Sequence, residues 1–309
     1  MPIPSIMLPV HLHRRRVLAL LASLTAGCHA FGQRPEAAVL RSELERTYVS
    51  WLQAMRRSDM AAFATQTSRY RQMCLRNEVV SLRQPWPAAV FKVQSVIQAP
   101  DVSPLTYIDA ASVGDTARVV YFGRVDFALD SVITPENPLI VRFLRENGVW
   151  KFDVIQYVNL GNDEDTRREA RAGGRKWLDT PEFQLTGRYP DIPKACREPY
   201  QIAALSIVAQ SCKVTVDVNH GTHIETVENN TGGRVITGGM QKGPNHITIT
   251  PVATGTPERL PQLSISILTR TETYRPSTKL WTWKPPEPDG KWLPKYEATV
   301  FVKSRAAVR

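Results

Sequence analysis

The sequence lacks most of the motifs that identify an enzyme by residue type and spacing. Beyond residue 28 it contains no Gly-x-Ser-x-Gly nucleophile turn, Walker phosphate loop, dinucleotide-binding glycine pattern, Cys-x-x-Cys pair or His-Glu-x-x-His. Histidine, a common proton carrier in active sites, is also scarce: the chain has six, and none lies between residues 30 and 160. These absences exclude the motif-defined hydrolases, nucleotide-dependent enzymes and zinc peptidases, and nothing in the sequence indicates a cofactor.

Cysteine is scarce too, with four in 309 residues. The three that follow Cys28 are Cys74, Cys196 and Cys212. An oxidising compartment would allow one bridge among them, and Cys196 with Cys212 is the obvious pair. The segment 200–219, however, reads as two strands that fold back around Gln210 and Ser211, which would separate these thiols by more than the ~7 Å that a disulfide spans. The sequence therefore leaves the pairing open.

The N-terminus carries the pattern of an export signal. Three arginines, Arg14 to Arg16, precede the apolar run VLALLASLTAG, which is too short to span a bilayer and ends in small residues before Cys28. The segment LTAGC resembles a bacterial lipobox, although Thr25 stands where such motifs usually carry Leu. The resemblance implies that residues 1–27 are a lipoprotein signal peptide and that Cys28 is lipidated. A plain secretory signal is the alternative.

Charge and sorting signals favour an envelope protein. His29, rather than Asp, follows the cysteine, which by analogy with enteric sorting implies the periplasmic side of the outer membrane. Removal of residues 1–27 takes away three arginines and no acid, so the formal net charge falls from +10 to +7. A basic balance favours contact with anionic lipid or polysaccharide. Nucleic acid is not an expected partner, because the protein is exported and no nucleic-acid-binding motif is present.

The first part of the mature chain is predicted to begin with two helices. Between residues 36 and 55 apolar side chains recur at three- and four-residue spacing, which predicts an amphipathic helix. These side chains are Leu40, Leu44, Tyr48, Trp51, Leu52 and Met55. Ser58 and Asp59 interrupt the pattern with capping residues, and MAAFATQTS is predicted to form a short second helix.

Strands follow, and they end in a hairpin. TARVVYFGRVDFALD alternates apolar and polar residues except at Val120 and Phe122, and Asn147-Gly148 is typical of a tight hairpin turn. The helix, polar break and second helix in YVSWLQAMRRSDMAAFATQTS, with the Gly-x-Trp-x-x-Asp element of NGVWKFD, resemble the nuclear transport factor 2-like superfamily. The resemblance implies a cone of curved antiparallel sheet wrapped around the N-terminal helix.

The hairpin strand also predicts what the sheet packs against. Simple alternation sends Trp150, Phe152 and Val154 to one face and Lys151 and Asp153 to the other. The apolar face must be buried, so Trp150 and Phe152 are expected to pack against the first helix, which carries Tyr48, Trp51 and Leu52.

Polar residues of the same sheet are the candidate contacts for a ligand inside the cone. They are Tyr121, Arg124, Asp126 and Tyr157. Enzymes of this fold usually place His, Asp or Tyr in the pocket to move protons. Asp126 and Asp153 are the carboxylates available for that role, but Arg124 and Asp126 share a strand face and would pair. We therefore assign no catalytic residue, and an enzyme that uses the cone pocket is the alternative.

Residues 161–199 are predicted to connect two domains. NDEDTRREARAGG places acids at a helix start and arginines further along, and it has almost no apolar stripe, which predicts a solvated helix followed by a proline-containing linker. A basic group in this segment is a second candidate site, for anionic lipid, although an exposed charged helix needs no ligand. The group comprises Arg167, Arg168, Arg171, Arg175 and Lys176.

Residues 200–305 are predicted to form a β-sandwich. KVTVDV, HITIT, QLSISIL and EATVFV alternate as half-buried strands, and GGMQKGPNHITIT resembles a connection common in accessory sandwich domains. Trp281 and Trp283 share one strand face, where they would either stack on a glycan or fill the core.

The histidines of this region are candidate ligands for a metal ion. His220 and His223 flank a turn and His246 starts a later strand, and a metal would need a third ligand to converge with them, for example Glu225 on the strand face of His223. NHGT is a natural hairpin turn, which accounts for His220 without a metal, so no metal site is predicted.

The sequence thus predicts an α+β protein with four segments: a signal peptide at 1–27, a nuclear transport factor 2-like domain at 28–160, a charged connector at 161–199 and a sandwich at 200–305. The expected role is non-catalytic binding of a small ligand, glycan or envelope protein at a membrane to which the lipid anchors the chain. An isomerase, dehydratase or hydrolase that uses the cone pocket is the alternative.

Overall fold

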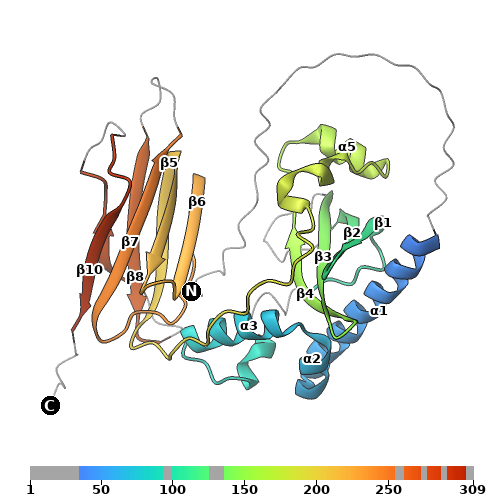
Figure 1. Cartoon of the computed structure of the whole chain (residues 1–309), viewed down its shortest axis with the longest axis horizontal. Coiled ribbons are helices and arrows are strands. Elements are labelled where there is room, and N and C mark those ends of the chain that lie inside the picture. The colour runs from blue at the N-terminus through green and yellow to red at the C-terminus, as the bar shows by residue number, and fades with distance from the viewer. Residues whose placement is uncertain are drawn as a thin grey trace. The chain divides into compact units, whose positions relative to one another are not determined.

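A computed structural model describes residues 35–92, 99–124, 136–254, 261–272, 277–286 and 291–303. Runs of helices and runs of antiparallel strands are segregated along the chain in an α+β fold, which confirms the predicted class (Figure 1). The chain separates into two compact units. Residues 35–72 and 99–191 form the β1–β4 unit, and residues 73–92 and 192–303 form the β5–β10 unit. The domain boundaries read from the sequence stay a prediction.

The β1–β4 unit is built on a four-stranded antiparallel meander. The strands follow one another in the order β1-β2-β3-β4, with bounds β1 (Thr106–Val113), β2 (Thr116–Arg124), β3 (Glu136–Glu146) and β4 (Val149–Tyr157). The predicted turn between β3 and β4 is confirmed, because Asn147 and Gly148 have positive φ angles of 51° and 80°. The helices and 3₁₀ turns of this unit are α1 (Pro35–Arg57), α2 (Met60–Gln66), α5 (Glu164–Arg171), η2 (Lys176–Asp179) and η3 (Pro181–Phe183).

Helix α1 lies along one face of this sheet, here called the α1 face (Figure 1). Its predicted apolar stripe is buried: Leu44, Tyr48 and Trp51 are each at most 2% exposed. The break after it is also confirmed, because Asp59 caps α2 by accepting a hydrogen bond from the Ala62 amide at 3.0 Å. Helix α3 (Arg69–Ser81) follows and crosses in sequence from the first unit to the second.

A β-bulge at Asp153 changes the face of every later residue in β4. Phe152 pairs with Phe143 and Val154 with Arg142, so Asp153 is the extra residue. Trp150 and Phe152 are buried, as predicted, but the prediction that Val154 shares their face is wrong. Because one residue is inserted, Tyr157 moves to the α1 face, opposite Leu139.

The opposite face of the sheet is covered as well, by residues 164–183, and is here called the α5 face. Val120, Phe122 and Ile140 pack there in one buried cluster with Ala170, Trp177, Leu178 and Phe183. This second layer explains why Val120 and Phe122 interrupt the alternation of β2. The prediction of a solvated connector helix is wrong, because Thr166 and Ala170 of α5 are 0% exposed.

The β5–β10 unit is a six-stranded antiparallel sheet. Its strands are β5 (Ile202–Val218), β6 (His223–Gly232), β7 (Gly243–Ala253), β8 (Gln262–Arg270), β9 (Thr278–Trp283) and β10 (Tyr296–Val302), and the 3₁₀ turn η1 (Ala88–Lys92) also belongs to this unit. The order is β10-β7-β5-β8-β9, and β6 also pairs with β5. Sheet edges β9 and β10 approach each other, because the rings of Trp283 and Tyr296 lie 5.0 Å apart.

Strand β5 runs without a break where the sequence predicted two strands folding back, so that prediction is wrong. A bulge replaces the turn: Ser211 has a φ of +53°, and the register with β6 shifts between Ala209 and Lys213. The alternating buried residues of β5 have odd numbers from 203 to 209 and even numbers from 212 to 218. The bulge therefore keeps the apolar side chains of both halves on the buried face. Strand β5 thereby pairs with β8 in its first half and with β7 in its second.

The core of this unit is formed by the apolar side chains that alternate with polar ones in the predicted strands. Val214, Val216 and Val218 are each 0% exposed, as are Ile249 and Ile267. Among the described residues, Cys74, Cys196 and Cys212 are not joined by a disulfide. Within the same described residues, no helix is both long and apolar enough to cross a membrane.

Candidate functional site

The α1 face of the β1–β4 sheet is filled by the protein's own aromatic rings. The Trp51 and Phe152 rings stack with centroids 3.6 Å apart, and Tyr48 lies 6.0 Å from Phe152. This confirms the predicted packing of Phe152 against the first helix. Trp150 is only 1% exposed, and the guanidinium of Arg145 lies over its ring. These rings occupy the region where the cone prediction places a ligand.

A polar cluster lies beside these rings on the α1 face. Tyr107, Tyr121, Leu139 and Tyr157 stand opposite one another in successive strands. The Tyr121 hydroxyl donates a 2.7 Å hydrogen bond to Glu45 Oε1 of α1, and burial together with this carboxylate raises the pKa of Tyr121. Burial also raises the pKa of Tyr157 to about 12. The structure therefore brings together two of the predicted contacts, Tyr121 and Tyr157.

Two further members of this cluster come from residues that the sequence did not single out. Arg41 donates to Glu45 Oε1 at 2.8 Å, and its guanidinium lies 3.9 Å from the centroid of the Tyr107 ring. Arg41 and Glu45 are spaced by one helical turn, which is the signal that could have revealed them. The predicted Arg124 is exposed at the end of β2, and Asp126 lies outside the described residues, so their pairing stays a prediction.

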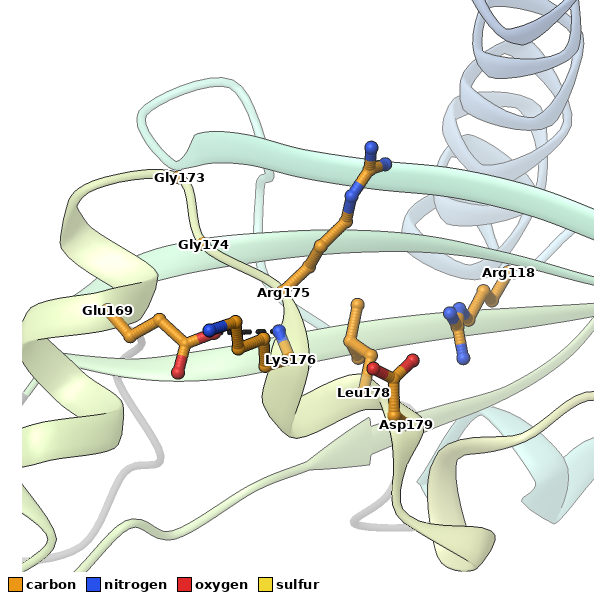
Figure 2. A pocket seen from close by; sticks show the side chains of 8 residues that line it. All are labelled: Arg118, Glu169, Gly173, Gly174, Arg175, Lys176, Leu178 and Asp179. Carbon is orange, nitrogen blue, oxygen red and sulfur yellow. Dashed lines mark hydrogen bonds between the residues drawn. The ribbon is translucent and has the colours of Figure 1, made fainter. Parts of the chain in front are cut away.

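A pocket of about 520 Å³ opens on the α5 face (Figure 2). One strand residue, Arg118 of β2, forms part of its wall, and the rest comes from the end of α5 and from η2. The residues that line it are Arg118, Glu169, Gly173, Gly174, Arg175, Lys176, Leu178 and Asp179. This Arg118 pocket was not predicted, because its two parts are about fifty residues apart and neither carries a motif.

Arg118 is held in place by the unit's own polar groups. It is 8% exposed, its Nη1 donates to the Phe183 carbonyl, and its Nη2 lies 3.3 Å from Asp109 Oδ2. Asp109 also accepts from Arg175 Nη1 at 2.9 Å, so one carboxylate of β1 positions two guanidinium groups. The Nε of Arg118 is buried and has no hydrogen-bond partner among the described residues.

The wall opposite Arg118 depends on a glycine pair after α5. Gly173 has a φ of +77°, which ends the helix, and a Cβ on Gly174 would lie 2.3 Å from Glu169 Cγ. Because Gly174 leaves this room, Glu169 Oε1 accepts the Lys176 amide at 2.7 Å and the chain turns into η2. The adjacent Leu178 is 1% exposed and anchors η2 to the sheet.

The basic group predicted as a lipid contact is mostly engaged within the protein. Arg167 pairs with Glu164, Arg168 with Asp165, Arg171 with Glu136 and Arg175 with Asp109. Arg167 is moreover only 7% exposed. Four of the five cations therefore have internal partners, which weakens the case for this helix as a lipid-binding surface.

In the β5–β10 unit, the predicted tryptophans lie on the core side. Trp283 pairs with Ile265 and Trp281 with Ile267, and both rings pack against the core while remaining partly exposed at the sheet edge. His220 lies in the predicted turn with a φ of +54°.

His223 and Glu225 have surroundings that do not depend on a metal. Glu225 instead pairs with Arg234 at 3.4 Å, and burial lowers the pKa of His223 to about 4. In the described chain no group of three His, Cys, Asp or Glu residues is arranged to hold a metal ion.

The chain matches no protein family, curated protein or solved structure. Its site is therefore judged from its own geometry, and the Arg118 pocket is the better candidate than the aromatic-filled α1 face.

Proposed function

We propose that this chain is a lipid-anchored protein of the bacterial envelope that binds a small polar molecule without transforming it. The Arg118 pocket is the observation that carries the binding proposal: charged side chains surround a space of about 520 Å³, within the range of small-molecule sites. The anchor rests on Cys28 and the export pattern before it.

Our proposal includes a finer description of each unit. The β1–β4 unit is taken as a nuclear transport factor 2-like cone, and α1 lying along an antiparallel meander supports this assignment. The β5–β10 unit is taken as a sandwich, and the sharing of β5 between β7 and β8 supports that form. The second unit would present the first at the membrane or contact an envelope protein or glycan.

The filling of the α1 face favours binding over catalysis. Catalysis in a cone would need a substrate between the helix and the sheet, where the Trp51 and Phe152 rings stack at 3.6 Å. Opening that space would expose two large buried side chains to water. A polar pocket on the other face can accept a ligand without this rearrangement.

A second candidate function rests on the contact between Glu45 and Tyr121. A carboxylate 2.7 Å from a buried hydroxyl is a geometry that proton transfer can use, and the Glu45 side chain is 30% exposed. An isomerase or dehydratase working there would use Glu45 and Tyr121, with Tyr157 in the same row.

Equilibrium dialysis against a small-molecule extract of bacterial envelopes, read by mass spectrometry, separates the two functions. The binding proposal predicts that some compound is enriched on the protein side and is recovered unchanged. Consumption of a compound, abolished by Glu45→Gln, would overturn the proposal in favour of the enzyme.

A further inference from the structure

We infer that the Arg118 pocket binds a small dipolar molecule of the α-amino acid class, which carries a carboxylate and a protonated amine. The inference rests on the proposed binding function and names its ligand. The observation behind it is a cation and a carboxylate, Lys176 and Asp179, that line one pocket and have no ion-pair or hydrogen-bond partner for their side chains within the described residues.

Arg118 supplies the fixed point for the ligand carboxylate. Its side chain is nine-tenths buried, and Asp109 and the Phe183 carbonyl restrict its guanidinium to one position. Figure 2 shows that guanidinium directed at the same space as the Asp179 carboxylate. A buried donor without a partner is unfavourable, and the Nε of Arg118 is such a donor among the described residues.

The distribution of charge excludes a simple anion site. Glu169 and Asp179 face the pocket together with Arg118, Arg175 and Lys176, so a phosphate or sulfate would meet two carboxylates. Arg175 is also committed to Asp109. These carboxylates would attract a ligand that carries an ammonium group. A ligand with both an ammonium and a carboxylate group would pair with the carboxylates and with the cations of the lining.

The centre of the pocket suits a short carbon skeleton. Leu178 is the apolar residue of the lining, and it lies between Lys176 with Glu169 on one side and Asp179 with Arg118 on the other (Figure 2). Its burial leaves little side-chain surface for a large apolar group. Small α-amino acids, whose two charges are separated by one carbon atom, therefore fit better than long amphipathic molecules.

Three related probes test the inference by calorimetric titration of the full chain: alanine, propionate, which lacks the amine, and ethylamine, which lacks the carboxylate. We expect saturable binding of alanine, with each single-charge probe weaker by about tenfold or more, the usual loss for one charge-assisted hydrogen bond. Propionate binding as tightly as alanine would overturn the dipolar assignment and leave an anion site.

Substitutions of two exposed pocket residues test the carboxylate-binding and the amine-binding groups separately, without disturbing the core. Lys176→Gln should weaken alanine and propionate by about tenfold and leave ethylamine unchanged, whereas Asp179→Asn should weaken alanine and ethylamine. Lys242→Gln and Asp191→Asn, exposed residues outside the pocket lining, are the matched controls.

Different experimental results would show that this inference is wrong and that the binding proposal is wrong. One possible result is that an envelope compound is retained unchanged, and that Lys176→Gln and Asp179→Asn retain it as well as the wild type does. The Arg118 pocket would then not be its site, so the inference would be wrong although the binding proposal would stand. If a compound is converted, the binding proposal itself is wrong.

Discussion

Ser68 Oγ donates a 3.1 Å hydrogen bond to Asp153 Oδ1 across 85 residues of sequence. The same Ser68 oxygen accepts the Arg71 amide at 3.0 Å, so it caps the start of α3 while it contacts the bulge of β4. Next to it, Thr67 pairs with Phe152 in an isolated parallel bridge. The carboxylate of the Gly-x-Trp-x-x-Asp element therefore connects the helices to the sheet, which is a structural role.

This contact predicts a difference between two substitutions of Asp153. Burial raises the pKa of Asp153, with Arg71 and Ser68 acting in the opposite direction, so the charge itself adds little stability at neutral pH. Asp153→Asn keeps an acceptor for Ser68 and should change the free energy of unfolding by less than about 1 kcal/mol. Asp153→Ala leaves Ser68 unpaired in a buried site and should cost about 1–3 kcal/mol.

Urea unfolding of both variants at pH 7 checks this, with the exposed Asp115→Ala as control. Because the folded-state pKa of Asp153 is raised, its favourable contribution is fully present below the unfolded value of 3.8 and is lost as the pH rises through the folded value. Equal losses in Asp153→Asn and Asp153→Ala would contradict the account.

His223 predicts a pH dependence of the opposite sign. Burial lowers its pKa from 6.5 to about 4. Between these pH values the unfolded chain binds a proton at this histidine, whereas the folded chain does not. Its stabilising contribution is present above pH 6.5 and is lost as the pH falls toward 4, by up to about 3 kcal/mol.

The measurement is the free energy of unfolding at pH 7 and pH 4.5 in wild type and in His223→Gln. The loss on acidification should be smaller in the variant, because it has no group to protonate at this position. The exposed His220→Gln should behave as wild type. If the loss is the same in His223→Gln, another group controls the acid sensitivity.

Phe152 is expected to be the most costly position of the Asn-Gly hairpin to truncate. It is 3% exposed and stacks on Trp51, so Phe152→Ala should lower the free energy of unfolding by about 3–5 kcal/mol. Phe301→Ala, at a side chain that is 65% exposed, should change it by less than about 0.5 kcal/mol. Thermal unfolding followed by circular dichroism tests the pair, and similar melting temperatures for both variants would refute the packing described for the α1 face.

Cys28 predicts where the protein is found after fractionation. Cys28→Ser removes the acceptor of the proposed lipid, so the protein should move from the membrane fraction to the soluble envelope fraction. A variant that remains with the membrane after a salt wash would show that something other than lipid holds it there.

The sequence predicts those parts of the fold that repeat a local pattern. The stripe of Leu44, Tyr48 and Trp51 predicts α1, and Asn147-Gly148 predicts the hairpin, because spacing and turn chemistry are local properties. β-Bulges escape this reasoning. Asp153 and Ser211, for example, lie in bulges that have no signal in composition, and each bulge changes the face of the residues that follow.

The Arg118 pocket could not be predicted for a different reason. Its charged wall follows a helix that carries almost no apolar stripe, so the helix reads as solvated. The apolar residues that attach it to the sheet, Trp177, Leu178 and Phe183, lie after the helix rather than within it. Val120 and Phe122, apolar on the polar face of β2, were the available sign that a second layer covers the sheet.

The most direct test of the central claim is to map where a dipolar ligand changes the amide signals of the isotope-labelled full chain by nuclear magnetic resonance. We expect alanine to shift the amides of residues 169–179 and of β2 near Arg118, and we expect Lys176→Gln to suppress these shifts. Shifts centred instead on Glu45, Tyr107 and Tyr121 would place the ligand on the α1 face and contradict the account.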